Sequence, residues 1–335
     1  MQDYKEAIIK MVTYNMGLNS GESLLVATDV PGVEQWRGEP ELLNKMLIRA
    51  DFVRRVYAIL KQELPQNKVE FVPFITSGQH GSEPSEQLAQ AIKEYDVSLL
   101  LTSFSISHTN AREEATKLGR RIASMPGIEE QMFSENGPMA ADYDRVAVIC
   151  KRFADFITNG SEAHVVTDYG TDLHFSIAGR VGTTDDGFYN KNGLWGNLPA
   201  GEAFTAPVEG TANGIMVARA GWYPNLEEDM VFNFAEGLVT SIEGGGKVGD
   251  SFRELLFADD LHIHRRNCAE LGIGANQKAS KADNVLEAEK ILGTVHIAIG
   301  DSSHVGGVNE SDLHEDFVQN EVKLYIDGRL IPLYD

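Results

Sequence analysis

The sequence has few cysteines, and its apolar runs are short. Cys150 and Cys268 are the only cysteines among 335 residues, and they form neither a C-x-x-C pair nor a disulfide framework. The apolar run around residues 97–106 falls far short of the ~20 residues that a membrane helix needs. The first residues show no basic segment followed by an apolar one, so no secretory signal is expected. These absences predict a cytoplasmic protein in a reducing compartment.

Basic charge is also scarce. The chain has 29 Lys and Arg against 50 Asp and Glu, a formal net charge of -21. Such an excess repels phosphate backbones and anionic lipids, and the nearest basic cluster, Arg265-Arg266, is small. We therefore expect neither nucleic acid nor a membrane surface as a partner. The excess leaves open that some carboxylates hold metal ions.

No phosphate-binding loop follows any strand-like run. Neither G-x-G-x-x-G nor G-x-x-x-x-G-K-[ST] occurs there. Gly244-Gly-Gly246 follows an apolar run and precedes a helical pattern, but it lacks the spacing and the Lys-Ser/Thr pair, so a turn is the favoured interpretation. Nucleotide binding is not expected.

The periodicity of apolar residues divides the chain into two halves. Helical and strand patterns alternate over the first ~150 residues, which predicts a parallel sheet covered on both faces. After a helix at about 142–158, residues 163–245 form short alternating runs separated by Gly, Asn and Asp. We expect an α/β N-terminal domain with a mostly parallel sheet, residues 1–158, and a β-rich α+β C-terminal metal-binding catalytic domain, residues 159–335. Asp327-Gly328 predicts a terminal hairpin.

Candidate metal ligands gather in short segments of the second half. The period of two in a strand puts His296 on one face with Thr294 and Ala298, as for a side chain entering a cavity. His314 and Asp316 would likewise project to one side. Each residue alone has an ordinary structural explanation, but burying an unpaired carboxylate is costly. The five candidates are Glu202, Glu270, His296, His314 and Asp316.

This donor set suits a catalytic metal centre. Carboxylates and imidazoles without thiolate fit Zn, Mn, Co or Fe. Around two divalent ions, the three carboxylates leave one positive charge, which a bridging hydroxide can neutralise. Two such ions can activate water and orient a carbonyl, which is the chemistry of aminopeptidases.

The phrases that contain these residues resemble a known family. They are Leu198-Pro-Ala-Gly-Glu-Ala-Phe-Thr-Ala-Pro207, residues 269–274, residues 289–300 and residues 311–316. In order and spacing they resemble the M29 metallo-aminopeptidases, the aminopeptidase T/AmpS/PepS group, in a short form. The resemblance implies a homodimeric hydrolase that removes N-terminal residues from small peptides. It also implies a metalloprotease centre with two divalent ions, Zn, Co or Mn with Fe as an alternative, on the five ligands.

One position departs from that family. Its members carry a tyrosine seven residues after the strand histidine, and here Ser303 stands at that place, followed by His304. Either residue is a candidate catalytic hydrogen-bond donor in place of the tyrosine.

A second family shares this scaffold. The chain is also similar to the iron-dependent 2,5-dihydroxypyridine dioxygenases, which hold one Fe(II) with two histidines and one carboxylate. One of their histidines falls at the place of Glu270, and they lack counterparts of Glu202 and His296. On ligand chemistry, the dinuclear aminopeptidase is the main expectation and the ring-cleaving dioxygenase is the alternative. A non-catalytic metal-binding protein is a third hypothesis, against which the five ligands argue.

His108 lies where the catalytic base of those dioxygenases aligns. It has two interpretations: a base at the carboxyl end of a strand, facing the metals across an interdomain cleft, or an incidental neighbour of a helix cap made by Ser107 or Thr109. Arg112 either meets a substrate carboxylate or pairs with a surface acid, and the second is favoured.

Overall fold

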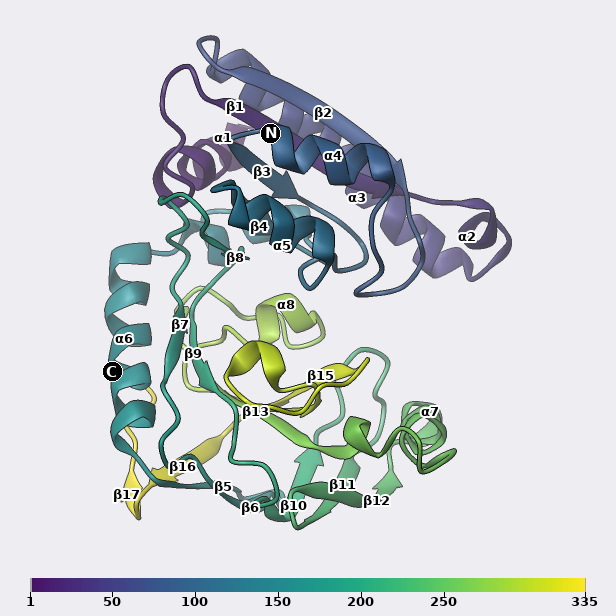
Figure 1. Cartoon of the computed structure of the whole chain (residues 1–335), viewed down its shortest axis with the longest axis vertical. Coiled ribbons are helices and arrows are strands. Elements are labelled where there is room, and N and C mark those ends of the chain that lie inside the picture. Colours follow the sequence, from purple (N-terminus) through teal and green to yellow (C-terminus); the bar gives the residue numbers. More distant parts are fainter. Residues whose placement is uncertain (1, 335) are drawn as a thin grey trace. The chain divides into compact units, whose positions relative to one another are not determined.

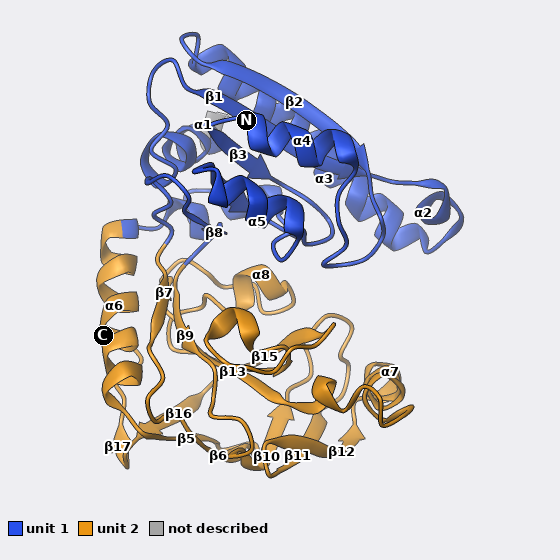
Figure 2. Cartoon of the chain, viewed as in Figure 1, with its two compact units in different colours: residues 1–143, 187–200 blue, residues 144–186, 201–335 orange. Residues whose placement is uncertain are grey.

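The computed structural model describes residues 2–334, which form two compact units (Figure 2). The first unit holds the described residues up to Tyr143 together with Gly187–Ala200. The second unit holds Asp144–Asp186 and the described residues from Gly201 onward. These units differ from the expected domains 1–158 and 159–335 in helix α6 (Tyr143–Asn159) and in the segment 187–200. The assignment of domains stays a prediction.

The first unit is built on a five-stranded parallel sheet with strand order β2-β1-β3-β4-β8 (Figure 1). Helices alternate with these strands along the chain, as the apolar periodicity predicted. The elements are α1 (Gln2–Lys10), β1 (Ser23–Val30), α2 (Val33–Arg37), α3 (Pro40–Glu63), β2 (Lys68–Ile75), α4 (Glu86–Glu94), β3 (Val97–Leu100), α5 (Asn110–Lys117), β4 (Arg121–Ser124) and β8 (Trp195–Asn197).

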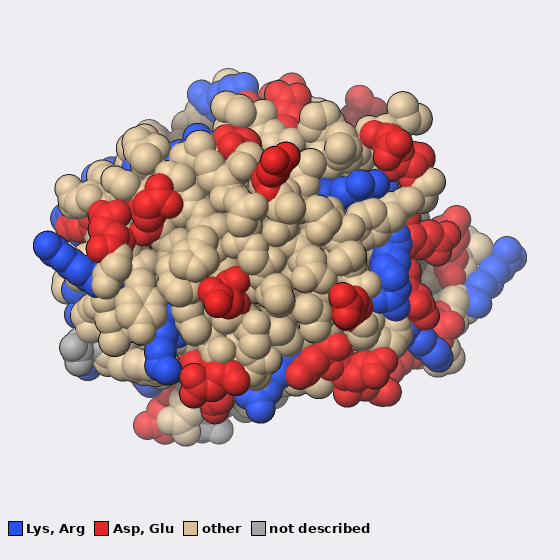
Figure 3. Space-filling view, turned by 90° about the horizontal axis from the view of Figure 1, so that it is seen from below, with Lys and Arg blue, Asp and Glu red and all other residues tan. Residues whose placement is uncertain are grey.

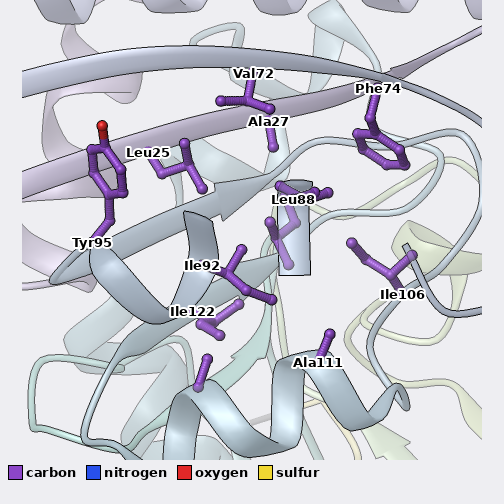
Figure 4. Close-up of a cluster of buried hydrophobic side chains, with 12 residues drawn as sticks. Leu25, Ala27, Val72, Phe74, Leu88, Ile92, Tyr95, Ile106, Ala111 and Ile122 are labelled. Atoms are coloured by element: carbon purple, nitrogen blue, oxygen red, sulfur yellow. The ribbon is translucent and has the colours of Figure 1, made fainter. Parts of the chain in front are cut away.

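A hydrophobic core joins this sheet to α4 and α5 (Figure 4). Leu25 and Ala27 of β1 lie in the same cluster as Leu88 and Ile92 of α4, and all four are fully buried. α4 presents its apolar side to the sheet because Leu88 and Ile92 stand four residues apart, on one face of the helix. Burial of apolar area, at about 25 cal/mol per Å², therefore favours the packing of α4 and α5 on this sheet.

Strand β8 reaches the parallel sheet from far along the sequence. Trp195 pairs with Ile122 and Asn197 with Ser124, so residues 195–197 extend the sheet beyond β4. A three-residue strand carries too little local pattern to be recognised, and its pairing depends on a contact across about seventy residues of chain. For this reason the sequence did not predict it.

The second unit contains two antiparallel sheets (Figure 1). The seven-stranded sheet has the order β12-β11-β10-β6-β5-β16-β17, and the five-stranded sheet has the order β15-β14-β13-β9-β7. The elements are α6 (Tyr143–Asn159), β5 (Glu162–Thr167), β6 (Asp172–Ser176), β7 (Thr183–Asp185), β9 (Glu202–Thr205), β10 (Asn213–Ala218), β11 (Met230–Ala235), β12 (Leu238–Gly244), α7 (Gly246–Phe257), β13 (Cys268–Gly274), α8 (Val285–Ala288), β14 (Val295–Gly300), β15 (His314–Gln319), β16 (Val322–Ile326) and β17 (Arg329–Leu330).

The observed fold is therefore a mixed α/β fold with one parallel sheet and separate antiparallel sheets. The predicted terminal hairpin is confirmed, because β16 and β17 pair through Ile326 and Arg329 on either side of Asp327-Gly328. None of the described helices combines the length and the apolar character needed to cross a bilayer. On the face shown in Figure 3, acidic and basic side chains lie scattered among uncharged ones.

Candidate metal centre

Four neighbouring strands of the five-stranded sheet bring the five candidate ligands together. Antiparallel pairing places β9, β13, β14 and β15 side by side, with Ala298 opposite both Glu270 and Asp316. Residues two apart in a strand share a face, so the ligands converge on one side of the sheet. They are Glu202 at the start of β9, Glu270 in β13, His296 in β14, and His314 and Asp316 in β15.

Glu270 lies between the two imidazoles. Its Oε1 is 3.4 Å from Nε2 of His296, and its Oε2 is 3.2 Å from Nε2 of His314. The second oxygen of Glu202, Oε2, is 3.3 Å from Nε2 of His296. Nε2 of His314 is 3.7 Å from Oδ2 of Asp316, which confirms that these two side chains project to the same side.

The centre is buried, and glycine makes room for it. His296 has an exposed fraction of 0%, Glu270 of 5% and Glu202 of 6%. Gly272 stands directly opposite His296 in the neighbouring strand, and a Cβ at this position would overlap Nε2 of the imidazole. A side chain at residue 272 is therefore incompatible with the observed position of His296.

Three further charged residues, which the sequence analysis did not assign, belong to the same centre. Lys290 is 1% exposed, and its Nζ lies 2.5 Å from Oε1 of Glu202 and 3.7 Å from Oε2 of Glu289. Oδ2 of Asp185 is 3.9 Å from the same Nζ. In the sequence, Glu289-Lys290 looks like an ordinary solvated pair before a strand, so no local signal marks it as buried.

The charges of the centre shift one another's pKa values. Burial raises the pKa of Glu270, but hydrogen bonds from His296 and His314 outweigh it and hold the pKa below its usual range. Burial lowers the pKa of His296, yet Glu270 and Glu202 raise it to about 9. Burial also raises the pKa of Glu289 well above its usual value. The cluster thus binds positive charge strongly, in the form of protons or of a cation.

The donor set fits a divalent metal ion. Oε2 of Glu202 and Oδ1 of Asp316 are buried and make no hydrogen bond within residues 2–334, so a cation would satisfy both oxygens. Imidazole and carboxylate donors without thiolate are typical of catalytic Zn, Mn, Co or Fe. Two sets of three residues have their ligand atoms within 4.8 Å of one another, namely Glu202 with Glu289 and His296, and Glu270 with His296 and Asp316.

Ser303 and His304, the two candidate catalytic donors, lie in a short 3₁₀ turn after β14 and are exposed. Oγ of Ser303 donates to Oδ1 of Asp301 at 2.8 Å, and Nε2 of His304 is 4.0 Å from the same oxygen. The other oxygen of Asp301 accepts a bond from the backbone N–H of Ser311 at 2.9 Å. Asp301 therefore organises the loop that leads into His314, and catalytic roles for Ser303 and His304 stay predictions.

His108 belongs to the first unit, just before α5. Oγ1 of Thr109 accepts a bond from the backbone N–H of Arg112, so Thr109 is the cap of this helix. The imidazole of His108 lies edge-on to Trp195, with ring centroids 5.6 Å apart. The catalytic role of His108 stays a prediction.

Arg112 is held inside the first unit. Its Nε donates to the carbonyl oxygen of Ser107 at 2.6 Å, and its guanidinium carbon lies 3.8 Å from the ring centroid of Trp195. The residue is only 7% exposed. These contacts differ from the expected pairing with a surface acid. The guanidinium packs on an indole ring and donates a hydrogen bond to a backbone carbonyl oxygen.

Comparison with known proteins identifies the family. The sequence model described as 2,5-dihydroxypyridine 5,6-dioxygenase matches residues 47–332, which is most of the chain. The chain belongs to this family. A 2,5-dihydroxypyridine 5,6-dioxygenase of Pseudomonas putida KT2440 is 21% identical over 252 residues, covering 70% of this chain and 69% of that protein.

Two solved structures share the fold of this dioxygenase family member. The 2,5-dihydroxypyridine dioxygenase from Pseudomonas putida KT2440 matches with a TM-score of 0.71 and 17% identity, over 99% of this chain and 95% of that chain. Wild-type AmpT from Thermus thermophilus matches with a TM-score of 0.66 and 15% identity, over 99% and 97%. At these identities the likeness shows the fold alone.

These findings correct the main expectation from sequence. Membership in the M29 metallo-aminopeptidases is wrong, and so are the terms hydrolase, aminopeptidase and metalloprotease, because the matching family is a dioxygenase family. The physical reason for the error is that AmpT and the dioxygenase have one scaffold, so the metal-bearing strands alone do not define the reaction. A dioxygenase family implies a metal, and candidate residues for one are present.

Proposed function

We propose that the chain is a non-haem Fe(II) dioxygenase that opens the ring of a dihydroxylated nitrogen heterocycle of the 2,5-dihydroxypyridine type. The observation that carries the proposal is the family match over residues 47–332, which contains every residue of the candidate centre. A small-molecule substrate is part of this proposal. The homodimer expected from sequence stays a prediction.

The donors of the centre support a single iron ion. His296 and His314 supply two imidazoles, and Glu270 and Asp316 supply carboxylates within 3.2–3.7 Å of those rings. Two histidines and one carboxylate with open positions are the ligand set of non-haem Fe(II) oxygenases. In the sequence comparison above, the 2,5-dihydroxypyridine dioxygenases have a histidine at the place of Glu270. In this chain the second imidazole would come from His296 on the adjacent strand.

The surrounding residues set the charge and the orientation of this ligand set. Lys290 pairs with Oε1 of Glu202 in a buried ion pair, which leaves Oε2 of Glu202 and the other carboxylates available to the ion. The backbone carbonyl of Asp301 fixes the ring of His314.

When bound, Fe(II) supplies the redox chemistry that allows dioxygen to react with an organic ring. Both oxygen atoms enter the product, so the ring-opened product is heavier than the substrate by one dioxygen.

The test is reconstitution of the metal-stripped chain with Fe(II) without air, followed by addition of 2,5-dihydroxypyridine and dioxygen. We expect one dioxygen to be consumed per ring opened, and ¹⁸O₂ to place both labels in the product by mass spectrometry. The chain loaded with Zn(II) is the matched control and should consume no dioxygen. An iron-loaded chain that leaves a panel of dihydroxylated pyridines and benzenes unchanged would overturn the proposal.

A further inference from the structure

Two histidines and an aspartate lie together on the seven-stranded sheet, which is a different sheet from that of the candidate metal centre. His164 of β5 stands directly opposite His174 of β6, and Asp172 precedes His174 by two residues in the same strand. Because residues two apart share a face, all three side chains project to the same side. Their neighbours Ala163, Val165, Leu173 and Phe175 are buried, so this side is the outer face of the sheet.

The three side chains meet at one oxygen atom. Oδ1 of Asp172 is 2.8 Å from Nε2 of His164 and 3.4 Å from Nε2 of His174. The two imidazole rings stack with centroids 3.6 Å apart and planes inclined by 18°. All three donor atoms lie within 4.8 Å of one another.

These separations are close to those around a bound ion. Donors about 2.0–2.1 Å from a tetrahedral zinc lie roughly 3.3 Å from one another. The observed 2.8 and 3.4 Å bracket that value. The stacked, nearly parallel rings must rotate apart for the lone pairs of both Nε2 atoms to point at one ion, and both side chains lie on the exposed face of the sheet, where such a rotation is possible. The strand pairing supplies the rigidity, because it fixes the Cβ positions of His164 and His174 across the sheet.

The cluster borders an accessible hollow. The exposed fractions of the side chains are 31% for His164, 67% for Asp172 and 60% for His174. Both histidines line a cavity of about 550 Å³ together with Tyr325, Lys323 and Glu162. The ammonium of Lys323 is paired with Asp168 at 3.2 Å, and Tyr325 stacks beside His164 with centroids 5.8 Å apart. Solvent ions and small ligands can therefore reach the cluster.

We propose that His164, Asp172 and His174 form a second divalent-metal site, of the class that takes Zn(II), on the outer face of the seven-stranded sheet. Three protein donors leave a position of a tetrahedral ion open toward the 550 Å³ hollow, where water or a small anion completes the coordination. The site is independent of the proposed dioxygenase reaction, since none of its residues belongs to the buried centre.

The test is equilibrium dialysis of the untagged, metal-stripped full chain against Zn(II) alone, with bound zinc measured by mass spectrometry. Wild type should bind one more ion than His174→Ala and than Asp172→Asn, both exposed changes that leave the sheet core intact. His262→Ala is the matched control, because His262 also contacts an exposed aspartate, Asp259, at 2.8 Å. This control should bind as much zinc as wild type.

A second measurement locates the ion. In ¹⁵N-histidine-labelled protein, Zn(II) should shift the Nε2 resonances of His164 and His174, and it should do so in His314→Ala, whose buried centre is disrupted. If wild type and His174→Ala bind the same number of ions with the same affinity, or if the two resonances do not respond to zinc, the cluster is only a surface hydrogen-bond network and the proposal is wrong.

Discussion

Nδ1 of His314 lies 2.7 Å from the backbone carbonyl oxygen of Asp301. A carbonyl oxygen only accepts, so Nδ1 carries the hydrogen and donates it. In the neutral ring, Nε2 then carries the lone pair that can bind a metal ion. Nε2 faces Glu270 at 3.2 Å and Asp316 at 3.7 Å. The backbone thus selects the tautomer and the ring orientation that a metal ligand requires.

Replacing His314 by alanine should remove one imidazole from the centre without disturbing the sheet, because the residue lies at the first position of β15 and is 29% exposed at its side chain. We expect iron affinity to fall by at least about 10–100-fold, with loss of dioxygen uptake. Iron content after dialysis and an oxygen electrode measure both effects. His262→Ala should keep iron and activity. Full iron content in His314→Ala would contradict its assignment as a ligand.

Gly272→Ala tests the close approach between β13 and β14. A methyl group at residue 272 would overlap Nε2 of His296, so the imidazole must turn away from Glu202 and Glu270. We expect a loss of iron affinity of at least about tenfold, accompanied by a destabilisation of about 1–3 kcal/mol from overpacking. Iron titration and urea unfolding measure the two effects.

The control for this overlap is a double-mutant cycle with His296→Ala. Without the imidazole, Gly272→Ala should cost much less stability, since the two changes are in direct contact and do not add. Equal costs of Gly272→Ala in the two backgrounds would show that His296 is not the group that collides.

Local pattern predicted much of the fold. The period of two in residues 294–299 and the spacing of His314 and Asp316 correctly predicted which side chains share a face, because both depend only on neighbours in the chain. Gly272 and Lys290 were missed because their roles depend on which strand or loop lies opposite, which is set by packing across the fold. Three-residue strands such as β8 escaped for the same reason.

The reaction class was harder to predict than the convergence of the candidate ligands. The phrases around Glu202, Glu270 and His296 describe a sheet that can hold a metal, and that sheet belongs to a fold shared by AmpT and a dioxygenase. Ligand-bearing strands therefore carry information on where an ion binds. What the ion does there also depends on the metal itself and on the groups that meet the substrate. For this reason, the favoured aminopeptidase assignment failed although its residues do converge.

Lys290→Met should destabilise the second unit strongly. Its ammonium lies among the carboxylates of Glu202, Glu289 and Asp185 and is 1% exposed, so its removal leaves buried negative charge unpaired. We expect a loss of about 3–5 kcal/mol in the free energy of unfolding of the metal-free chain, measured with urea. Lys151→Met is the control, because Lys151 pairs with Asp155 on an exposed helix face and should contribute only about 0.3–0.5 kcal/mol. Similar losses in the two variants would mean that Lys290 does not neutralise a buried cluster.

Glu130 should make stability depend on pH in the acid range. Both of its oxygens accept hydrogen bonds from Arg55 at 2.7 Å, and these bonds hold the pKa of Glu130 below its usual value of 4.5. A carboxyl whose pKa is lower in the folded chain than in the unfolded chain contributes stability that is complete above about pH 4.5 and is lost as pH falls through the folded pKa.

Glu130→Gln should therefore lower Tm at about pH 7, by the equivalent of up to about 1 kcal/mol for this partly exposed pair. The difference in Tm between the variant and wild type should close toward about pH 3. Thermal unfolding across this range provides the measurement, with the exposed Glu310→Gln as the control that should follow wild type. A gap that stays constant or widens on acidification would show that the ion pair with Arg55 is not its source.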